Sequence, residues 1–531
     1  MNLRNFWLLL LILALGSLQP LTAQSAGYQT ANMLMQQQEY EEALPILRSL
    51  YSDNPSSFIY FDRLTECLIQ LKRFGEARRV AGDSDAQNRF TTQALLKLAE
   101  IEHMDGNREE AIRIWDRIIE LRPGSHQTYF TVGNSMQERN EFDLAIDLYQ
   151  RAREKMNDRT LFLNELANTY MQAGRFEESV NEYFRLITVA PDQMSLVQQR
   201  FLRMRDETLY EIAAFELEDR LISLDTSHRA YSPMYQLLIW LLLETEEYQR
   251  AFIFARQYEN RTSYTIYSLF SLGSQLRSAR KFELATRSYQ YYTDSQSDAL
   301  KARALDELSK SYLEWGEFQL DNNLQTATTP ETPFDNSYRA GEELIQSFPN
   351  YEQIGDVYSR LIDISVDIYK DLERAKTWFR DMQNRPQLQI PAYLLYAEGR
   401  IALFEKDFTR ARQALTRAER QSDETNLSEK ARYFLSLSDF FSEDYEFAEV
   451  QLKSMERRTS SYYANDAIKL RMWIKNGMRA DTTGQVLDAV SRSMYQLHTG
   501  KYEEAMTEAE PLLATSRSEE HTSELQSHAP I

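Results

Sequence analysis

Residues 160–193 read TLFLNELANTYMQAGRFEESVNEYFRLITVAPDQ, and this 34-residue unit decides the fold. Two runs of helix-forming residues flank Gly174, and Pro191 follows the second run. Glycine suits the left-handed backbone that ends a helix, and proline cannot continue the interior of one. Ala167 and Ser179, one in each run, are small enough to let two helices approach closely. The unit is therefore predicted to be a helical hairpin.

The same pattern recurs upstream with a period of 34 residues. Each unit has a small anchor residue early in its second predicted helix: Ala43, Ala77, Ala111, Ala145 and Ser179. Twelve residues before the anchors stand Ala31, Thr65, Ala99, Gly133 and Ala167. Three residues before them stand Tyr40, Phe74, Arg108, Phe142 and Phe176. The turns between helices carry Gly106, Asn140 and Gly174, and prolines end three units at Pro55, Pro123 and Pro191. A fixed period of this length indicates stacked repeats.

Beyond Pro191 the period becomes irregular, although anchors continue at Ala251, Ala285, Ala340, Ala375, Ala411, Ala448 and Ala505. A segment rich in Asn, Thr and Pro interrupts them and predicts a loop or hinge. A helix such as 466–475 is expected to fill the last long gap. We therefore expect a regular array over residues 24–193, irregular hairpins over 194–320, a loop or hinge over 321–337 and a degenerate array over 338–516.

In these motifs the sequence resembles the tetratricopeptide repeat family, of an exported bacterial type. The resemblance implies an all-α fold, an α–α superhelix of helical hairpins whose inner groove is formed mostly by the first helices. It also implies that this groove binds peptide segments of partner proteins, in part through asparagine side chains. The candidate groove residues are Phe130, Asn134, Gln137, Asn164, Asn168 and Met171. The alternative interpretation is that these side chains only solvate an exposed helix face.

Composition and motifs argue against several classes of function. A formal charge of -20 disfavours a continuous basic track for nucleic acid. Cys67 is the single cysteine, and the histidines form no zinc motif, so we expect no metal and no cofactor. Phosphate-binding loops and nucleophile elbows are missing from the sequence. Carboxylate pairs such as Glu177-Glu178 recur at one repeat position, where they complement the helix macrodipole, and we predict that the chain is not an enzyme.

The two ends of the chain differ in character from the repeats. Phe6 to Leu15 is an apolar run of ten residues after a basic start, and a small residue, Ala23, follows. This pattern predicts a cleaved signal peptide over residues 1–23, because the run is too short to span a bilayer. The mature protein is then expected in the periplasm or at the outer membrane. Residues 517–531 look like a translated sequencing adapter and are expected to be an artefact.

These observations predict a non-catalytic scaffold for other proteins, with components of the cell envelope or outer membrane as the expected partners. One alternative is that the repeats are the sensory half of an enzyme or signalling protein whose catalytic domain follows residue 516. A second alternative is a carbohydrate-binding envelope protein that uses the 31 tyrosines. Tyrosines gathered on one exposed groove would favour this second alternative, and tyrosines buried between hairpins would exclude it.

Overall fold

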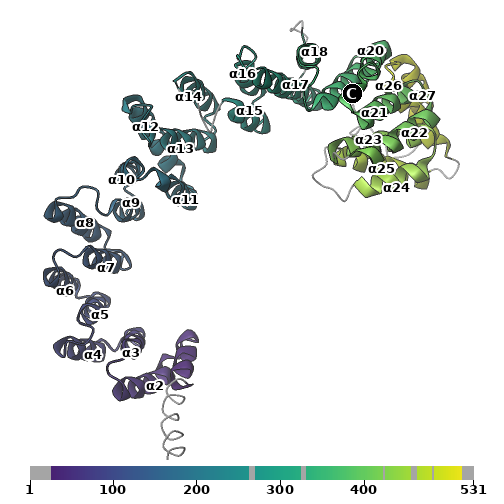
Figure 1. Cartoon of the computed structure of the whole chain (residues 1–531). Helices are drawn as coiled ribbons and strands as arrows, with labels where there is room; N and C mark the ends of the chain where they lie inside the picture. Colours follow the sequence, from purple (N-terminus) through teal and green to yellow (C-terminus); the bar gives the residue numbers. More distant parts are fainter. Residues whose placement is uncertain are drawn as a thin grey trace, which may run out of the picture. The chain divides into compact units, whose positions relative to one another are not determined.

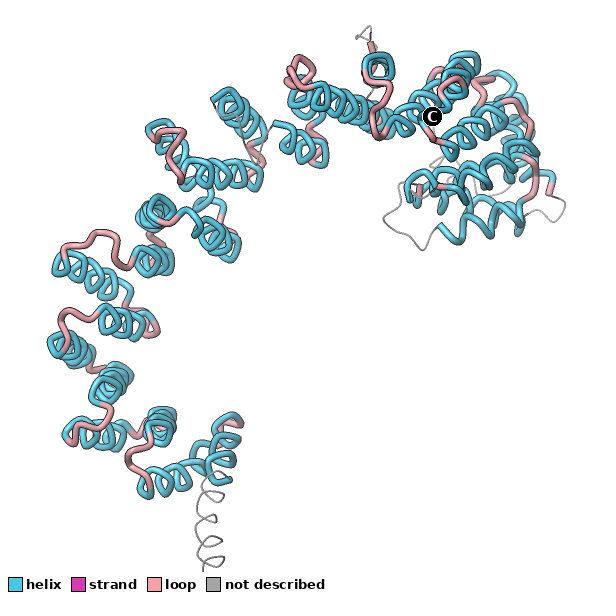
Figure 2. Tube along the Cα trace, viewed as in Figure 1, coloured by secondary structure: helices cyan, strands magenta, loops and turns pink. Residues whose placement is uncertain are grey.

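A computed structural model describes residues 26–261, 269–324, 331–422, 425–455, 463–480 and 484–516. This part of the chain consists of helices and their connections, without a strand, so the predicted all-α fold is confirmed (Figures 1 and 2). The chain divides into unit 1, Met1–Glu247, and unit 2, Tyr248–Ile531. The predicted signal peptide and adapter-like tail lie outside the described residues.

Unit 1 is a series of helical hairpins. Its first helices α3, α5, α7 and α9 follow one another along one side, and the second helices α4, α6 and α8 lie along the other (Figure 1). After helical residues 26–36 the elements are α2 (Tyr40–Asp53), α3 (Phe58–Gln70), α4 (Phe74–Ala86), α5 (Thr91–Met104), α6 (Arg108–Leu121), α7 (His126–Gln137), α8 (Phe142–Met156), α9 (Leu163–Gln172), α10 (Phe176–Val189), the 3-10 turn η1 (Pro191–Gln193), α11 (Met194–Met204), α12 (Glu207–Ser223) and α13 (Tyr231–Glu244).

Unit 2 continues with hairpins of less regular length. Its elements are α14 (Tyr248–Arg261), α15 (Leu269–Ser278), α16 (Phe282–Gln290), α17 (Asp298–Asp321), α18 (Pro333–Ser347), α19 (Ile354–Asp363), the π-helical turn η2 (Ile364–Ile368), α20 (Leu372–Gln383), the 3-10 turn η3 (Pro386–Leu388), α21 (Pro391–Phe404), α22 (Phe408–Gln421), α23 (Thr425–Phe441), α24 (Tyr445–Met455), α25 (Ala464–Ala480), α26 (Gln485–His498) and α27 (Tyr502–Ser516). Helix α25 fills the gap in which a helix is predicted.

The backbone repeats the predicted 34-residue phase. Residues with positive φ occur at the turn inside successive hairpins: Lys72 (55°), Gly106 (88°), Asn140 (59°) and Gly174 (73°). Each second helix then begins two residues later, at the repeat position that is aromatic in four of the five regular units. Corresponding turns in unit 2 contain Arg280, Lys406, Glu443 and Gly500. The predicted turn positions are therefore confirmed.

The anchor residues pack where the two helices of a hairpin meet. All five anchors of the regular array are fully buried. Ser179, which replaces alanine in its unit, donates a hydrogen bond from Oγ to the carbonyl oxygen of Ala167 at 2.7 Å. This bond satisfies the buried hydroxyl, which explains why serine is accepted at an alanine position.

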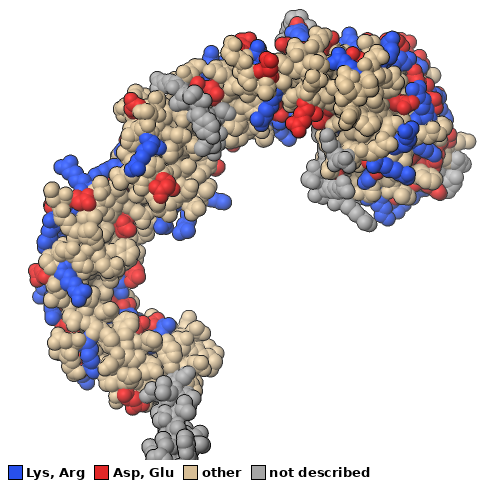
Figure 3. All heavy atoms as spheres, viewed as in Figure 1, with Lys and Arg blue, Asp and Glu red and all other residues tan. Residues whose placement is uncertain are grey.

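Several described tyrosines belong to the packing between helices. Among the described residues, Tyr149, Tyr183, Tyr289, Tyr358 and Tyr396 are fully buried. The burial of these five is the condition that counts against a carbohydrate-binding groove. Figure 3 shows acidic and basic side chains intermixed on the face of each unit that is in view.

The connection predicted over residues 321–337 is shorter than expected. Helix α17 extends to Asp321 and α18 begins at Pro333, so residues 333–337 are helical. Thr332 caps α18: its Oγ1 accepts a hydrogen bond from the Asp335 amide, and the Asp335 carboxylate accepts one from the Thr332 amide. Proline is favourable in the first turn after such a cap, because its missing N–H would have no helical acceptor there. Residues 325–330 lie outside the described part.

The last hairpin, α26–α27, packs against helices far away in the sequence. Tyr495 of α26 donates a hydrogen bond to the carbonyl oxygen of Phe404 at the end of α21, at 2.9 Å. Ser491 donates to the carbonyl oxygen of Phe440 at the end of α23, also at 2.9 Å. The hairpin thus covers the ends of earlier hairpins within unit 2. Across the described helices, none has both the length and the hydropathy needed to cross a bilayer.

Candidate functional site

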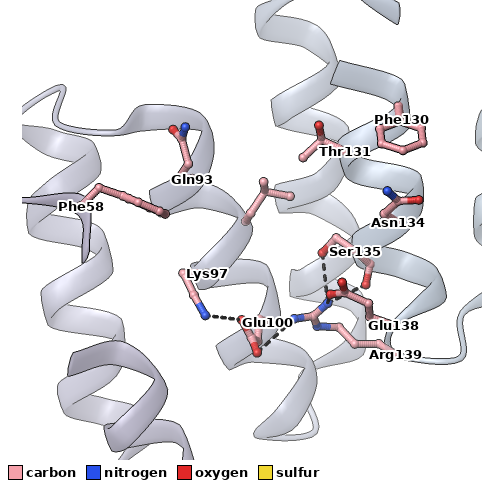
Figure 4. Close-up of a pocket in the computed structure, with 11 residues that line it drawn as sticks. Phe58, Gln93, Lys97, Glu100, Phe130, Thr131, Asn134, Ser135, Glu138 and Arg139 are labelled. Carbon is pink, nitrogen blue, oxygen red and sulfur yellow. Dashed lines mark hydrogen bonds and ion pairs between the residues drawn. The ribbon is translucent and has the colours of Figure 1, made fainter. Parts of the chain in front are cut away.

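The first helices of three successive hairpins in unit 1 line one pocket of about 360 Å³ (Figure 4). Phe58 comes from α3, Leu96 from α5 and Phe130 from α7. The side chain of Phe58 is 40% exposed and that of Phe130 is 37% exposed. The pocket therefore offers apolar surface from three hairpins to the solvent, and its volume is in the range typical of ligand sites.

Charged side chains form a connected row beside these apolar residues. Lys97 Nζ lies 3.0 Å from the carboxylate of Asp62 and 3.2 Å from that of Glu100. Arg139 reaches the same Glu100 carboxylate at 3.1 Å (Figure 4). Arg139 also donates to the carbonyl oxygen of Ser135 at 2.6 Å. These contacts link α3, α5 and the end of α7 and hold the charged groups in place.

The charges of this row are balanced against one another. Burial lowers the pKa of Lys97, but the carboxylates of Glu100 and Asp62 outweigh this effect and raise the pKa above its ordinary value. Lys97 therefore stays protonated at neutral pH. The charge of Lys97 is already paired. The amide side chains of Gln93 and Asn134, which also line the pocket, can instead recognise polar groups of a ligand.

The structure brings two of the predicted groove residues together in this pocket. Phe130 and Asn134 both line it. Gln137 lies one turn further along α7 and instead donates a hydrogen bond from Nε2 to the hydroxyl of Tyr149, at 3.3 Å. Gln137 therefore contributes to the contact between α7 and α8 and is not among the pocket-lining residues.

The other three predicted residues lie on α9, outside the pocket. Met171 is only 4% exposed, so its predicted place beside an open groove is wrong. Its side chain lies on the same face of α9 as Ala167, one turn earlier, and both residues are buried. Asn164 and Asn168 are half-buried, and the side-chain oxygen of Asn164 is itself shielded from solvent. Their role in binding stays a prediction.

Sequence reasoning missed most of the pocket, although the repeat contained part of the signal. Leu96, Lys97 and Glu100 stand 34 residues before Phe130, Thr131 and Asn134, and all six line the pocket. Moving the predicted patch one unit upstream would have added Leu96 and Glu100 to Phe130 and Asn134, although it would not have found Lys97. Phe58 carries no such signal, because the residue 34 positions later is Thr92, which is not among the lining residues.

Other chemistry-bearing groups do not assemble into a site in the described helices. There, no group of three or more His, Cys, Asp or Glu side chains could hold a metal ion. Cys67 is fully buried in the core of unit 1. Burial raises the pKa of its thiol to about 11, so the nucleophilic thiolate is scarce at neutral pH.

Comparison with known proteins gives a family for part of this region. Two family models described as tetratricopeptide repeat match residues 93–125 and 133–194. The first match covers the hairpin α5–α6, and the second runs from within α7 to the start of α11. No curated protein sequence matches the chain.

The solved structures that match this chain share little sequence with it. The Naa15/Naa10 complex bound to HypK-THB is 14% identical, with a TM-score of 0.26, over 93% of this chain and 89% of that one. Yeast Tom70 is 14% identical, with a TM-score of 0.30, over 86% and 96%. The APC/C hetero-tetramer Cut9-Hcn1 is 14% identical, with a TM-score of 0.30, over 95% and 96%. From the family matches, the chain carries tetratricopeptide repeats at residues 93–125 and 133–194.

Proposed function

We propose that this chain is a non-catalytic scaffold that binds an extended segment of a partner protein in the α3–α5–α7 pocket. One observation carries the proposal: three successive hairpins contribute the same side of their first helices to a single pocket. An extended peptide advances along its own axis, so it can contact the three helices in turn. Stacked hairpins form elongated binding surfaces of this kind.

The lining residues indicate what such a segment would present. An apolar side chain of the ligand would pack against Phe58, Leu96 and Phe130 and supply most of the binding energy. The amides of Gln93 and Asn134 each have donor and acceptor atoms, which suits the N–H and C=O groups of a peptide backbone. Lys97 and Arg139 are already ion-paired, so we expect selection for an apolar anchor more than for charge.

A peptide-display selection tests the groove. Random peptides displayed on phage are selected on the full chain, and the affinity of the enriched peptides is measured by fluorescence anisotropy. Truncating Phe130 to alanine should weaken binding about tenfold, the loss typical of an anchor contact, and Asn134→Ala should weaken it less. Asp143→Ala is the matched control, because this α8 side chain is 90% exposed and lies outside the pocket.

The control variant should bind like the unaltered chain. Thermal unfolding of all variants should agree closely, since Phe130 and Asn134 both reach solvent. Enriched peptides that bind Phe130→Ala and Asn134→Ala as tightly as the unaltered chain would place the ligand elsewhere and contradict the proposal.

We propose further that the scaffold acts in the cell envelope, with envelope or outer-membrane proteins as partners. The support is the apolar run 6–15 and the small residue Ala23, a pattern typical of a secretion signal. Residues 1–26 fused to mature β-lactamase should make a bacterium with two membranes resistant to ampicillin, because the enzyme acts in the periplasm. Leu10→Arg interrupts the apolar run and should abolish resistance, while Asn5→Gln should not. Resistance that survives Leu10→Arg would contradict export through this segment.

A further inference from the structure

A second pocket, of about 390 Å³, lies in unit 2 at an edge formed by helix ends. Arg280, Lys281 and Phe282 line it where the turn between α15 and α16 enters α16. The opposite wall is the last part of α17, with Trp315 and Phe318. None of these residues belongs to the α3–α5–α7 pocket, so the two sites are distinct.

Aromatic rings form an ordered wall in this second pocket. The ring of Trp315 lies nearly parallel to those of Tyr312 and Phe282, with centroids 6.2 Å and 6.3 Å away. The ring of Phe318 lies 5.6 Å from that of Phe282. Leu324 extends the wall and is 50% exposed. Packed rings of this kind offer a rigid apolar surface to a ligand at little cost in entropy.

Two exposed cations stand next to this wall. Arg280 lies over the ring of Phe318, with Cζ 5.3 Å from its centroid, and Lys281 lies over Tyr248 at 4.8 Å. In the part of the chain that the structure describes, neither cation has a carboxylate within ion-pair distance. The lining carboxylate, Glu283, faces a different cation, Arg287, at 3.9 Å. The pocket thus combines an apolar wall with two positive charges that are free to pair.

The two free cations contrast with the acidic composition of the whole chain. Acidic residues outnumber basic ones, 80 against 60. Two adjacent cations that stay free of carboxylates beside aromatic rings favour a ligand that brings negative charge and an apolar group together.

We propose that this pocket binds an acidic–aromatic segment of a partner protein. An aromatic side chain of the segment packs against Trp315 and Phe318, and flanking carboxylates pair with Arg280 and Lys281. Gln249 and Gln319, which also line the pocket, can bind the backbone of the segment. The site is separate from the groove of unit 1, so its failure in the test below would leave the proposed function intact.

Fluorine NMR of the full chain labelled with 5-fluorotryptophan tests this proposal. The Trp315 resonance is assigned from its loss in Trp315→Phe. The probe is the acetylated, amidated pentapeptide Gly-Glu-Phe-Glu-Gly, and two comparison peptides carry Ala for Phe or Lys for both Glu residues. The acidic–aromatic probe should shift the Trp315 resonance saturably. The affinity of each comparison peptide should be lower than that of the probe by about tenfold or more. Added sodium chloride should weaken the binding of the probe by screening the exposed charges.

Variants assign the binding to the pocket. The double variant Arg280→Gln, Lys281→Gln should bind the probe about tenfold more weakly, as expected for the loss of two exposed ion pairs. Its thermal stability should be unchanged. Arg256→Gln on α14 is the matched control, since this residue is exposed and does not line the pocket. Asn134→Ala should also leave the probe unaffected.

Several outcomes would overturn the proposal. One is equal binding of the lysine peptide or the alanine peptide, which would indicate a nonspecific apolar or anionic contact. Another is full affinity in the double variant. A Trp315 resonance that moves with protein concentration alone would indicate a second copy of the chain as the occupant and would equally reject a partner segment.

Discussion

Two glycines of unit 1 are required for different physical reasons. Gly133 on α7 faces Tyr149 on α8, and a Cβ atom added there would lie 2.2 Å from the tyrosine hydroxyl. Gly106 has no heavy atom within 4 Å of such a Cβ, but its φ of 88° is strained for any other residue. Gly133 is therefore required because a side chain would clash with Tyr149, and Gly106 because of its left-handed backbone conformation.

We expect alanine at the two positions to destabilise the chain to different extents. Gly133→Ala should lower the free energy of unfolding by about 2–3 kcal/mol, because the packed neighbour must move. Gly106→Ala should cost about 1 kcal/mol from the left-handed backbone alone. Urea unfolding followed by circular dichroism measures both. Shortening Tyr149 to leucine should rescue part of the Gly133→Ala loss but none of the Gly106→Ala loss, and purely additive effects in both pairs would refute the clash.

Asp439 makes the stability of unit 2 depend on pH. Its side chain is 1% exposed, with Arg412 Nε 2.7 Å from one carboxylate oxygen and Gln451 donating to the other at 2.8 Å. Burial raises the pKa of Asp439 to about 6, and Arg412 opposes the shift only in part. The unfolded carboxyl titrates near pH ~3.9. Between these two values the folded chain holds a proton that the unfolded chain has lost, so the contribution of Asp439 to stability falls as pH rises.

The variant Asp439→Asn isolates this effect. The free energy of unfolding of the unaltered chain minus that of Asp439→Asn should fall by up to about 3 kcal/mol between pH 4 and pH 6, and it should stay level above pH 7. Urea unfolding at four pH values measures the difference. A difference that grows as pH rises would mean that the ion pair with Arg412 outweighs burial and that the pKa is lowered instead.

At the scale of elements, helix starts are set by local capping as well as by the repeat. Most second helices begin three residues before their anchor, as the repeat predicts. Helix α18 is an exception, because Thr332 and Asp335 form a capping box that starts the helix seven residues before Ala340. Asp335 also accepts a hydrogen bond from the hydroxyl of Tyr369 at 2.7 Å, which ties this start to the end of η2.

Removing the cap should shorten α18. Thr332→Ala should destabilise the chain by about 1 kcal/mol, since the Asp335 amide loses its side-chain acceptor. Thr332→Ser keeps an oxygen at the same place and serves as the control, with a change below about 0.5 kcal/mol. Hydrogen exchange at the amides of the first turn should speed up in the alanine variant alone. Equal exchange in both variants would show that packing, without the cap, fixes this helix start.

At the scale of the whole molecule, the chain is two units, each with its own core. Clusters of buried apolar residues in unit 1 span neighbouring hairpins, such as the one around Trp115 and Tyr149. The main cluster of unit 2 extends from Tyr289 to Tyr495, because α26 packs back on earlier helices. Each stacked repeat stabilises mainly the repeats that it contacts. A destabilising substitution in one unit should therefore leave the stability of the other unit unchanged.

Matched core glycines in the two units test this separation. An added Cβ at Gly133 of unit 1 would meet Tyr149, and one at Gly399 of unit 2 would lie 2.5 Å from Leu415. In hydrogen exchange measured by mass spectrometry, Gly133→Ala should raise uptake within unit 1 only, and Gly399→Ala within unit 2 only. Uptake that rises across both units in either variant would show that the chain unfolds as one cooperative body.

The sequence alone determined the repeat and its local consequences. The 34-residue period placed the hairpin turns, the buried anchors and the starts of most second helices, because glycine conformation, proline exclusion and small-residue contacts act over a few positions. The resemblance to the tetratricopeptide repeat family, which rests on this period, implied that Phe130 and Asn134 face a groove, and both line a pocket.

Which repeated positions meet in space depends on how the helices pack in three dimensions. Asn164 and Asn168 occupy the same phase as Phe130 and Asn134, yet the pocket forms one hairpin earlier, around α5. The aromatic pocket beside Arg280 and the packing of α26 on the end of α21 are also contacts between separate helices. Such contacts depend on small rotations that accumulate from hairpin to hairpin, and no local pattern of residues encodes that sum.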